Sequence, residues 1–300
     1  GRGTRVAILD TGTDPSHIDL AGKIDLAHST TMVTSSPCPG DLVDFLDRNL
    51  HGSFVSGIVA TNGRGAASVA PDAHLIAVKV LNCLGSGSFA SIIAGILYAT
   101  NVGADVINMS LGAYFPKSTP GAARLLAALD RATTFAHSHG VLIVAAAGNG
   151  GIDLNKDRNF VFVPAQSAMV VSIGATGPFR QTNFDQLAFY TNFGTSGVDL
   201  FAPGGNQQPG GDPAHRDGIL SVCSSFSITV PVCASHNFYL LGGDGTSFSA
   251  PHAAGTAAVV KSQFPGSDAT QLQHCLFKGA DDLGQLYSHG RINVVGAAQC

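Results

Sequence analysis

Ser247 lies in the segment GDGTSFSAPH (243–252), ahead of a run of small residues that favours a helix. A serine hydroxyl is a poor nucleophile at neutral pH, so it reacts only when a neighbouring base takes its proton. At the beginning of a helix, Ser247 would also lie near free backbone N–H groups, which favour developing negative charge. Ser247 is therefore a candidate nucleophile; the alternative interpretation is an ordinary serine at a helix N-terminus.

Three other segments contain the groups that such a serine needs. His51 opens a run of small residues and is a candidate general base, while Asp10 ends an apolar run and could fix the tautomer of the imidazole. Asn149, followed by Gly150, could donate a hydrogen bond to an oxyanion. Each residue also has a structural interpretation, as a loop histidine, a strand-end aspartate or a turn asparagine.

The elements that must position these residues are predicted from apolar periodicity. Nearly continuous apolar runs indicate strands that are buried on both faces, as in a parallel sheet. These runs cover residues 5–9, 75–80, 106–109, 141–147 and 170–173. Residues 89–102 and 121–139 have helical periodicity, and a last helix is predicted from near Ser247 to Gln263. The alternation predicts a three-layer α/β fold, with a mostly parallel central sheet and helices on both faces.

Functional groups collect at the carboxyl ends of strands in open parallel sheets. Asp10, Ser110 and Asn149 each follow a predicted strand, so we expect them to outline one site. The sequence shows neither an internal repeat nor a low-complexity linker, which predicts one domain over residues 1–300. The stretches 35–46 and 224–244 are interpreted as surface insertions.

Composition and charge argue against several classes of function. Hydrophobic residues make up 45% of the chain and charged residues 12%, which favours a large core over disorder. The net charge is -4 and no basic cluster occurs, so we expect no nucleic-acid partner. No apolar run approaches the roughly 20 residues of a membrane-spanning helix.

Six cysteines occur without any CxxC pair, which favours disulfides over a zinc or redox site. Six cysteines allow 15 pairings, so a choice among them is a hypothesis. The most local choice is Cys223 with Cys233; Cys275 with Cys300 would tie down the C-terminal end, and Cys38 with Cys83 then remains. Disulfides would indicate an oxidising compartment, whereas the alternative is six buried thiols in a cytosolic protein.

The order Asp10, His51, Asn149, Ser247, with the flanking residues, resembles the subtilisin-like serine protease family (subtilases, peptidase family S8), whose triad runs Asp–His–Ser. Other segments match landmarks of that family, in the same order, over nearly the whole chain. They are VAP at 69–71, VKVL at 78–81, INMSLG at 107–112, FAPG at 201–204 and GRIN at 290–293.

The resemblance implies a secreted serine endopeptidase that hydrolyses peptide bonds through an acyl-enzyme intermediate. Asp10, His51 and Ser247 would form its catalytic triad, and Asn149 would bind the oxyanion together with the N–H of Ser247. The resemblance also implies a groove that binds an extended peptide. Its candidate residues are Gly85, Ser86, Gly87, Ser110, Leu111, Gly112, Ala146, Ala147 and Gly148. Small residues in these walls predict a roomy apolar slot and cleavage after large apolar residues.

Protein or peptide substrates are the partners that the resemblance implies; its own propeptide is a further candidate, and we expect a monomer. The chemistry requires no cofactor. Some relatives bind calcium in a loop that corresponds to residues 61–68, which is short here. Ca²⁺ needs about six to eight oxygen ligands, and no acidic cluster supplies them. We therefore predict no metal site there, and structural calcium elsewhere stays a hypothesis.

Two residues depart from the common pattern of the family. Phe54 stands where many subtilases have a second histidine, and Phe248 stands where many have a methionine directly after the nucleophile. Neither position belongs to the triad, so we expect an active enzyme with altered local packing. Because methionine can oxidise beside an active site, we also expect greater tolerance of peroxide than in relatives with that methionine.

Other protease and hydrolase classes fit the sequence less well. Asp10-Thr11-Gly12 matches an aspartic-protease signature, but that chemistry needs two such motifs, whose carboxylates share a proton. The sequence contains no second Asp-Thr-Gly and no Asp-Ser-Gly. Neither the Gly-x-Ser-x-Gly of esterases nor the His-Glu-x-x-His of zinc proteases occurs. The remaining alternative is a non-catalytic pseudoprotease that binds peptides, which is disfavoured because all four catalytic positions are filled.

Overall fold

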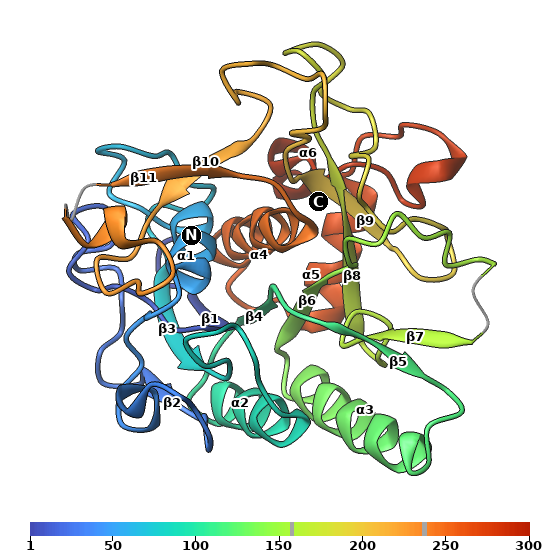
Figure 1. Cartoon of the computed structure of the whole chain (residues 1–300). Coiled ribbons are helices and arrows are strands. Elements are labelled where there is room, and N and C mark those ends of the chain that lie inside the picture. Colours follow the sequence, from blue (N-terminus) through green and yellow to red (C-terminus); the bar gives the residue numbers. More distant parts are fainter. Residues whose placement is uncertain (157–158, 236–238) are drawn as a thin grey trace.

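A computed structural model describes residues 1–156, 159–235 and 239–300 (Figure 1). Its centre is a 7-stranded parallel sheet in the order β2-β3-β1-β4-β6-β8-β9. The strands are β1 (Arg5–Asp10), β2 (Thr30–Thr31), β3 (His74–Lys79), β4 (Val106–Met109), β6 (Leu142–Ala146), β8 (Val170–Thr176) and β9 (Leu200–Pro203). The strand that ends at Asp10 therefore lies inside the sheet, between β3 and β4.

The sheet separates two hydrophobic cores, because neighbouring side chains of a strand point to opposite faces. In β1, Val6 and Ile8 belong to the first core, and Ala7 and Leu9 belong to the second. The helices of the first core are α1 (His51–Val59), α4 (Thr246–Gln263), α5 (Ala269–Lys278) and α6 (Val294–Ala298). Those of the second core, at the bottom of Figure 1, are α2 (Phe89–Asn101) and α3 (Ala122–Ser138). The predicted three-layer α/β fold is confirmed.

Each of the five predicted strands occurs in the sheet, and the three predicted helices occur as α2, α3 and α4. The prediction that α4 would be the last helix was wrong, since α5 and α6 follow it. A sequence signal for α5 exists: Asp268 and Gln271 form a capping box at its beginning. The edge strands β2 and β9 were not predicted: β2 has only two residues, both polar, and β9 ends in Pro203.

The disulfides join the three pairs chosen from the sequence: Cys38 with Cys83, Cys223 with Cys233, and Cys275 with Cys300. Insertion 35–46 contains the 3-10 helix η1 (Pro39–Leu42), and insertion 224–244 contains η2 (Pro231–Ser235) and β11 (Leu240–Gly243). Residues 236–238 of the second insertion lie outside the described residues. Strand β11 pairs with β10 (Ile219–Val222), and β5 (Ala113–Pro116) pairs with β7 (Phe160–Val163).

One sheet contributes side chains to both cores, which supports the prediction of a single domain over residues 1–300. Helix α4 contacts β4, β6, β8 and β9, so the helix that carries Ser247 is fixed against most of the sheet. Among the described helices, none combines the length and the apolar character that crossing a membrane requires.

Candidate active site

Asp10 and His51 come together where β1 meets α1. Asp10 is the last residue of β1 and is fully buried, and His51 is the first residue of α1, with 27% of its side chain exposed. The Nδ1 of His51 lies 2.8 Å from the Oδ1 of Asp10, and the N–H of Thr11 donates to the same oxygen at 2.7 Å. This contact occupies the Nδ1 atom of the imidazole. Its Nε2 atom stays available toward the pocket.

The charges around His51 favour its protonated form. Burial lowers the pKa of His51, but the charge and hydrogen bond of Asp10, with a further contribution from the charge of Asp47, raise it above its ordinary value. An imidazole in this environment accepts a proton more readily than a free one does. The arrangement therefore suits a general base.

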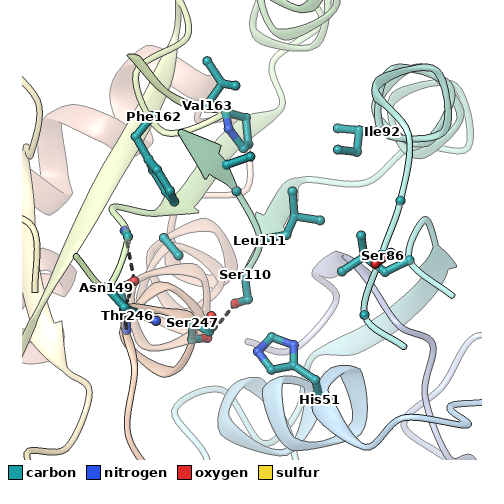
Figure 2. A pocket seen from close by; sticks show the side chains of 18 of the residues that line it. His51, Ser86, Ile92, Ser110, Leu111, Asn149, Phe162, Val163, Thr246 and Ser247 are labelled. Atoms are coloured by element: carbon teal, nitrogen blue, oxygen red, sulfur yellow. Dashed lines mark hydrogen bonds between the residues drawn. The ribbon is translucent and has the colours of Figure 1, made fainter. Parts of the chain in front are cut away.

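Ser247 lies in the first turn of α4, where backbone N–H groups have no intrahelical acceptor. The Oγ of Ser110 donates to the carbonyl oxygen of Ser247 at 2.6 Å, and the Nδ2 of Asn108 donates to the Oγ of Ser110 at 2.9 Å. A chain of polar contacts from β4 thus fixes this turn of the helix. Ser247 and His51 line the same pocket, from α4 and α1 (Figure 2).

Asn149 follows β6 and is oriented by Thr246. Its Oδ1 accepts hydrogen bonds from the N–H of Thr246 at 2.9 Å and from the Oγ1 of Thr246 at 2.7 Å. Because the oxygen is occupied, the Nδ2 donor is the atom that the side chain can offer to a ligand. Thr246 was not predicted as a functional residue, since its threonine side chain carries no signal apart from its place beside Ser247.

A groove joins these residues, and most of the candidate substrate-binding residues line it. Gly85, Ser86 and Gly87 lie on one side, and Ser110, Leu111, Gly112, Ala146 and Gly148 on the other walls, together with His51, Asn149 and Ser247. Ala147 is fully buried and does not line the groove. Its side chain belongs to a separate buried cluster, and its N–H bonds to the carbonyl of Ile173.

Phe162 on β7 also lines the groove and was missed by sequence reasoning. A Cβ atom placed on Gly112 would lie 2.6 Å from the ring of Phe162, and one placed on Gly148 would lie 2.9 Å from it. The ring therefore touches both walls of the predicted specificity slot, and it packs against Tyr114 at a centroid distance of 4.8 Å. Figure 2 shows Phe162 and Val163 on the side of the groove opposite Ser86 and Ile92.

The groove edge at 84–87 is anchored through Cys83. This residue forms the disulfide with Cys38; its N–H donates to the Oδ2 of Asp41 at 2.7 Å, and its carbonyl accepts from the Nδ2 of Asn49 at 3.0 Å. Cys38, Asp41 and Cys83 are also the single group within the described ranges whose side chains are close enough to share a metal ion. Both sulfurs are already bonded to one another, so they are not available as thiolate ligands.

The sequence of the chain is similar to that of known proteases over nearly its whole length. Residues 1–292 match the sequence model of the subtilase family. The chain belongs to the subtilase family. It is accordingly a serine endopeptidase, a hydrolase that acts on protein or peptide substrates, and subtilases need no cofactor for catalysis.

Curated relatives of this subtilase extend over all or nearly all of the chain. It is 33% identical to subtilisin DY of Bacillus licheniformis and 34% identical to subtilisin Savinase of Lederbergia lenta, in each case over 100% of the chain and 92% of the relative. It is 31% identical to the thermophilic serine proteinase of Bacillus sp. (strain AK1), over 98% of the chain and 61% of that protein.

Solved structures show the same fold. A lanthipeptide protease matches this subtilase with a TM-score of 0.82 and 27% identity, over 99% of the chain and 87% of that structure. The epidermin leader peptide processing protease EpiP of Staphylococcus aureus matches with a TM-score of 0.83 and 25% identity, over 99% of the chain and 75% of that structure.

Proposed function

We propose that this subtilase cuts peptide bonds with Asp10, His51 and Ser247 as its catalytic triad and Asn149 as an oxyanion donor. The observation that carries the proposal is the 2.8 Å contact between His51 and the buried Asp10 at the edge of the groove that Ser247 and Asn149 also line. Nucleophile, base, orienting carboxylate and oxyanion donor are the parts that acyl transfer by a serine requires.

In the proposed mechanism, the Oγ of Ser247 attacks the carbonyl carbon of the scissile bond while the Nε2 of His51 takes the hydroxyl proton. The negative charge moves to the carbonyl oxygen, which accepts hydrogen bonds from the Nδ2 of Asn149 and the N–H of Ser247. The imidazolium then gives its proton to the amine nitrogen as the C–N bond breaks. Water repeats the sequence on the acyl-enzyme, and Asp10 stabilises the imidazolium in both halves.

Substrates would bind as an extended strand between the segments 85–87 and 110–112, because exposed backbone groups there can pair with a peptide. The sequence prediction for the residue before the cut was a large apolar side chain in a roomy slot. The ring of Phe162, which touches both Gly112 and Gly148, supports a narrower preference. We propose that the slot is shallow and that small apolar residues such as alanine are preferred there.

We further propose that the enzyme is secreted. The three disulfides support this proposal because such bonds persist in oxidising compartments. A monomeric state and recognition of its own propeptide stay proposals from the family resemblance. The alternative function, a non-catalytic pseudoprotease that binds peptides, requires that the triad be unable to activate Ser247.

The deciding experiment treats the native protein with a fluorophosphonate probe and locates the adduct by mass spectrometry. The controls are Ser247→Ala and heat-denatured protein. We expect labelling at Ser247 in the native protein alone, since only an activated serine reacts. A well-folded protein that stays unlabelled would favour the pseudoprotease.

A further inference from the structure

Asp47 is a fully buried carboxylate just ahead of His51 in the sequence. Its Oδ1 accepts hydrogen bonds from the N–H groups of Asn49 at 3.1 Å and Leu50 at 3.0 Å, and its Oδ2 accepts one from the N–H of Ser53 at 2.8 Å. Backbone N–H groups at the beginning of a helix lack intrahelical acceptors. Asp47 therefore holds the turn of chain from which His51 and α1 begin.

A second connection runs from Asp47 to the strand that carries Asp10. The Oγ1 of Thr11 donates to the Oδ1 of Asp47 at 2.8 Å and accepts the N–H of Gly52 at 2.9 Å. Thr11 also donates its own N–H to the oxygen of Asp10 that contacts His51. Through Thr11, Asp47 links the end of β1 to the first turn of α1.

The hydrogen bonds to Asp47 also hold an unusual backbone conformation at Leu50. Leu50 has a φ of 151°, a positive value that a bulky side chain rarely adopts and that persists only where surrounding contacts hold it. Because Leu50 directly precedes His51, its conformation sets the direction in which α1 starts. One of the hydrogen bonds to Asp47 comes from the N–H of Leu50 itself.

The four hydrogen bonds to Asp47 all come from N–H or O–H donors, as a charged carboxylate requires. Burial raises the pKa of Asp47 above its ordinary value, and these donors together with the charge of Lys79 offset only part of that rise. Lys79 on β3 is fully buried; its Nζ donates to the carbonyl of Thr11 and lies 3.1 Å from Asp41. On β1, Asp10 adds a further negative charge.

We propose that Asp47 is a positioning residue of this active site: its buried carboxylate fixes His51 against Asp10 and adds a second negative charge to the environment of the imidazole. The inference rests on the triad proposed above. Asp47 would act in two ways: it holds His51 in position against Asp10, and its negative charge favours the protonated imidazole. Each effect can be tested with its own variant and its own measurement.

Asp47→Asn removes the charge and Thr11→Val removes the link while the charge stays. The matched control is Asp19→Asn. Asp19 is also fully buried and accepts three backbone N–H groups, those of Arg64, Gly65 and Ala66, but these belong to a loop outside the groove. For each variant, kcat, KM and the pH dependence of kcat/KM are measured on one peptide substrate, with the melting temperature as a test of folding.

We expect Asp47→Asn to lower kcat about 10- to 100-fold with little change in KM, because the base is displaced from its productive position. Loss of a negative charge also destabilises the imidazolium, so the acid limb of kcat/KM should move to lower pH by about one unit. Thr11→Val should lower kcat with a much smaller shift of that limb. Asp19→Asn should melt at a lower temperature and keep the wild-type kcat and pH profile.

An Asp47→Asn enzyme that matches Asp19→Asn in kcat and in its acid limb would overturn the proposal. If Asp47→Asn does not fold, Thr11→Val decides, and a wild-type kcat in that variant would overturn it. Fluorophosphonate labelling of the wild type distinguishes the two levels: an unlabelled wild-type Ser247 overturns the triad, and the role of Asp47 with it, whereas a labelled one confines any failure to Asp47.

Discussion

Phe54 and Phe248 stack with their ring centroids 4.1 Å apart. These are the two positions at which the sequence departs from the common pattern of the family, and they come from α1 and α4. The ring of Phe248 also lies 5.8 Å from that of His51. An aromatic pair of this kind contributes about 0.5–1.5 kcal/mol beyond the burial of its surface. The two departures therefore form one unit of packing beside the proposed triad.

The first prediction concerns oxidation beside the nucleophile. Phe248→Met should make the enzyme sensitive to peroxide, because a thioether next to Ser247 becomes a polar sulfoxide within the active site. The wild type should keep its activity under the same treatment. Activity is followed over time, and peptide mass spectrometry identifies the oxidised residues.

Met169 serves as an internal control for this experiment, since it is 50% exposed and should oxidise in both proteins. Rapid inactivation of the wild type, in step with oxidation of a residue adjacent to Ser247, would contradict the prediction. Loss of the stack with Phe54 also predicts a modestly lower melting temperature for Phe248→Met.

The second prediction concerns the residue before the cut. Phe162→Ala should raise kcat/KM for phenylalanine relative to alanine at that position by about 10- to 100-fold, because the slot between Gly112 and Gly148 becomes deeper. A series of peptides that differ only at this residue measures the ratio. Phe160→Ala is the matched control, because Phe160 lies on the same strand, is 41% exposed and does not line the groove.

Phe162→Ala also removes a buried ring, which typically costs about 3–5 kcal/mol of stability. Phe162→Leu therefore accompanies it as a smaller change, with an intermediate shift expected. If the wild type already prefers phenylalanine or tyrosine before the cut, Phe162 does not restrict the slot.

The third prediction concerns pH. Burial lowers the pKa of His51, but the charge and hydrogen bond of Asp10 and the charge of Asp47 together raise it above the ordinary value of 6.5. Since the base must be neutral to take a proton, kcat/KM should rise with pH through a pKa above that value. Asp10→Asn removes the charge that raises the pKa, so the acid limb should move to lower pH, and kcat should fall by about 10⁴-fold. A wild-type acid limb clearly below pH 6 would contradict this assignment.

The fourth prediction concerns the loop 61–68. Asp19 accepts the N–H groups of Arg64, Gly65 and Ala66 at 2.7, 2.8 and 3.1 Å, which is the kind of anchoring that a bound cation could otherwise provide. We expect a chelator to leave the melting temperature nearly unchanged, within about 1 °C. Asp19→Asn should lower it by about 3–8 °C, because an amide N–H₂ would face backbone donors and leave buried groups unsatisfied.

Scanning calorimetry with and without chelator checks both parts of this prediction. A large drop in the melting temperature of the wild type on chelation would mean that a structural cation stabilises the fold. In that case Asp19→Asn and chelator together would show whether the cation acts at this loop.

The sheet could be predicted from the sequence because strands buried on both faces are continuously apolar, and this pattern is local. Asp10, Ser110 and Asn149 could be placed at one edge because each directly follows such a strand. Phe162 could not be found in this way. Its position in the groove depends on the pairing of β7 with β5, which are distant in sequence, and the short strand β7 resembles many other apolar segments.

The supporting polar residues were missed for a different reason. Asp47 and Thr246 are single buried side chains that act through the residues to which they hydrogen-bond. The identity of a residue does not reveal which residue it will bond to in the fold. The positive φ of Leu50 could not be predicted either. Positions with a positive φ are usually occupied by glycine, and a leucine gives no sign of one.

Cys83 ties the edge of the substrate groove to the same piece of chain that carries the base. Asn49, two positions before His51, donates to its carbonyl, and the disulfide to Cys38 anchors it from the other side. A widening of the groove on this side would therefore break or strain the hydrogen bond to Asn49, which lies in the segment leading into His51. We therefore expect a bound peptide to adapt to a groove edge that the disulfide and Asn49 already hold in place.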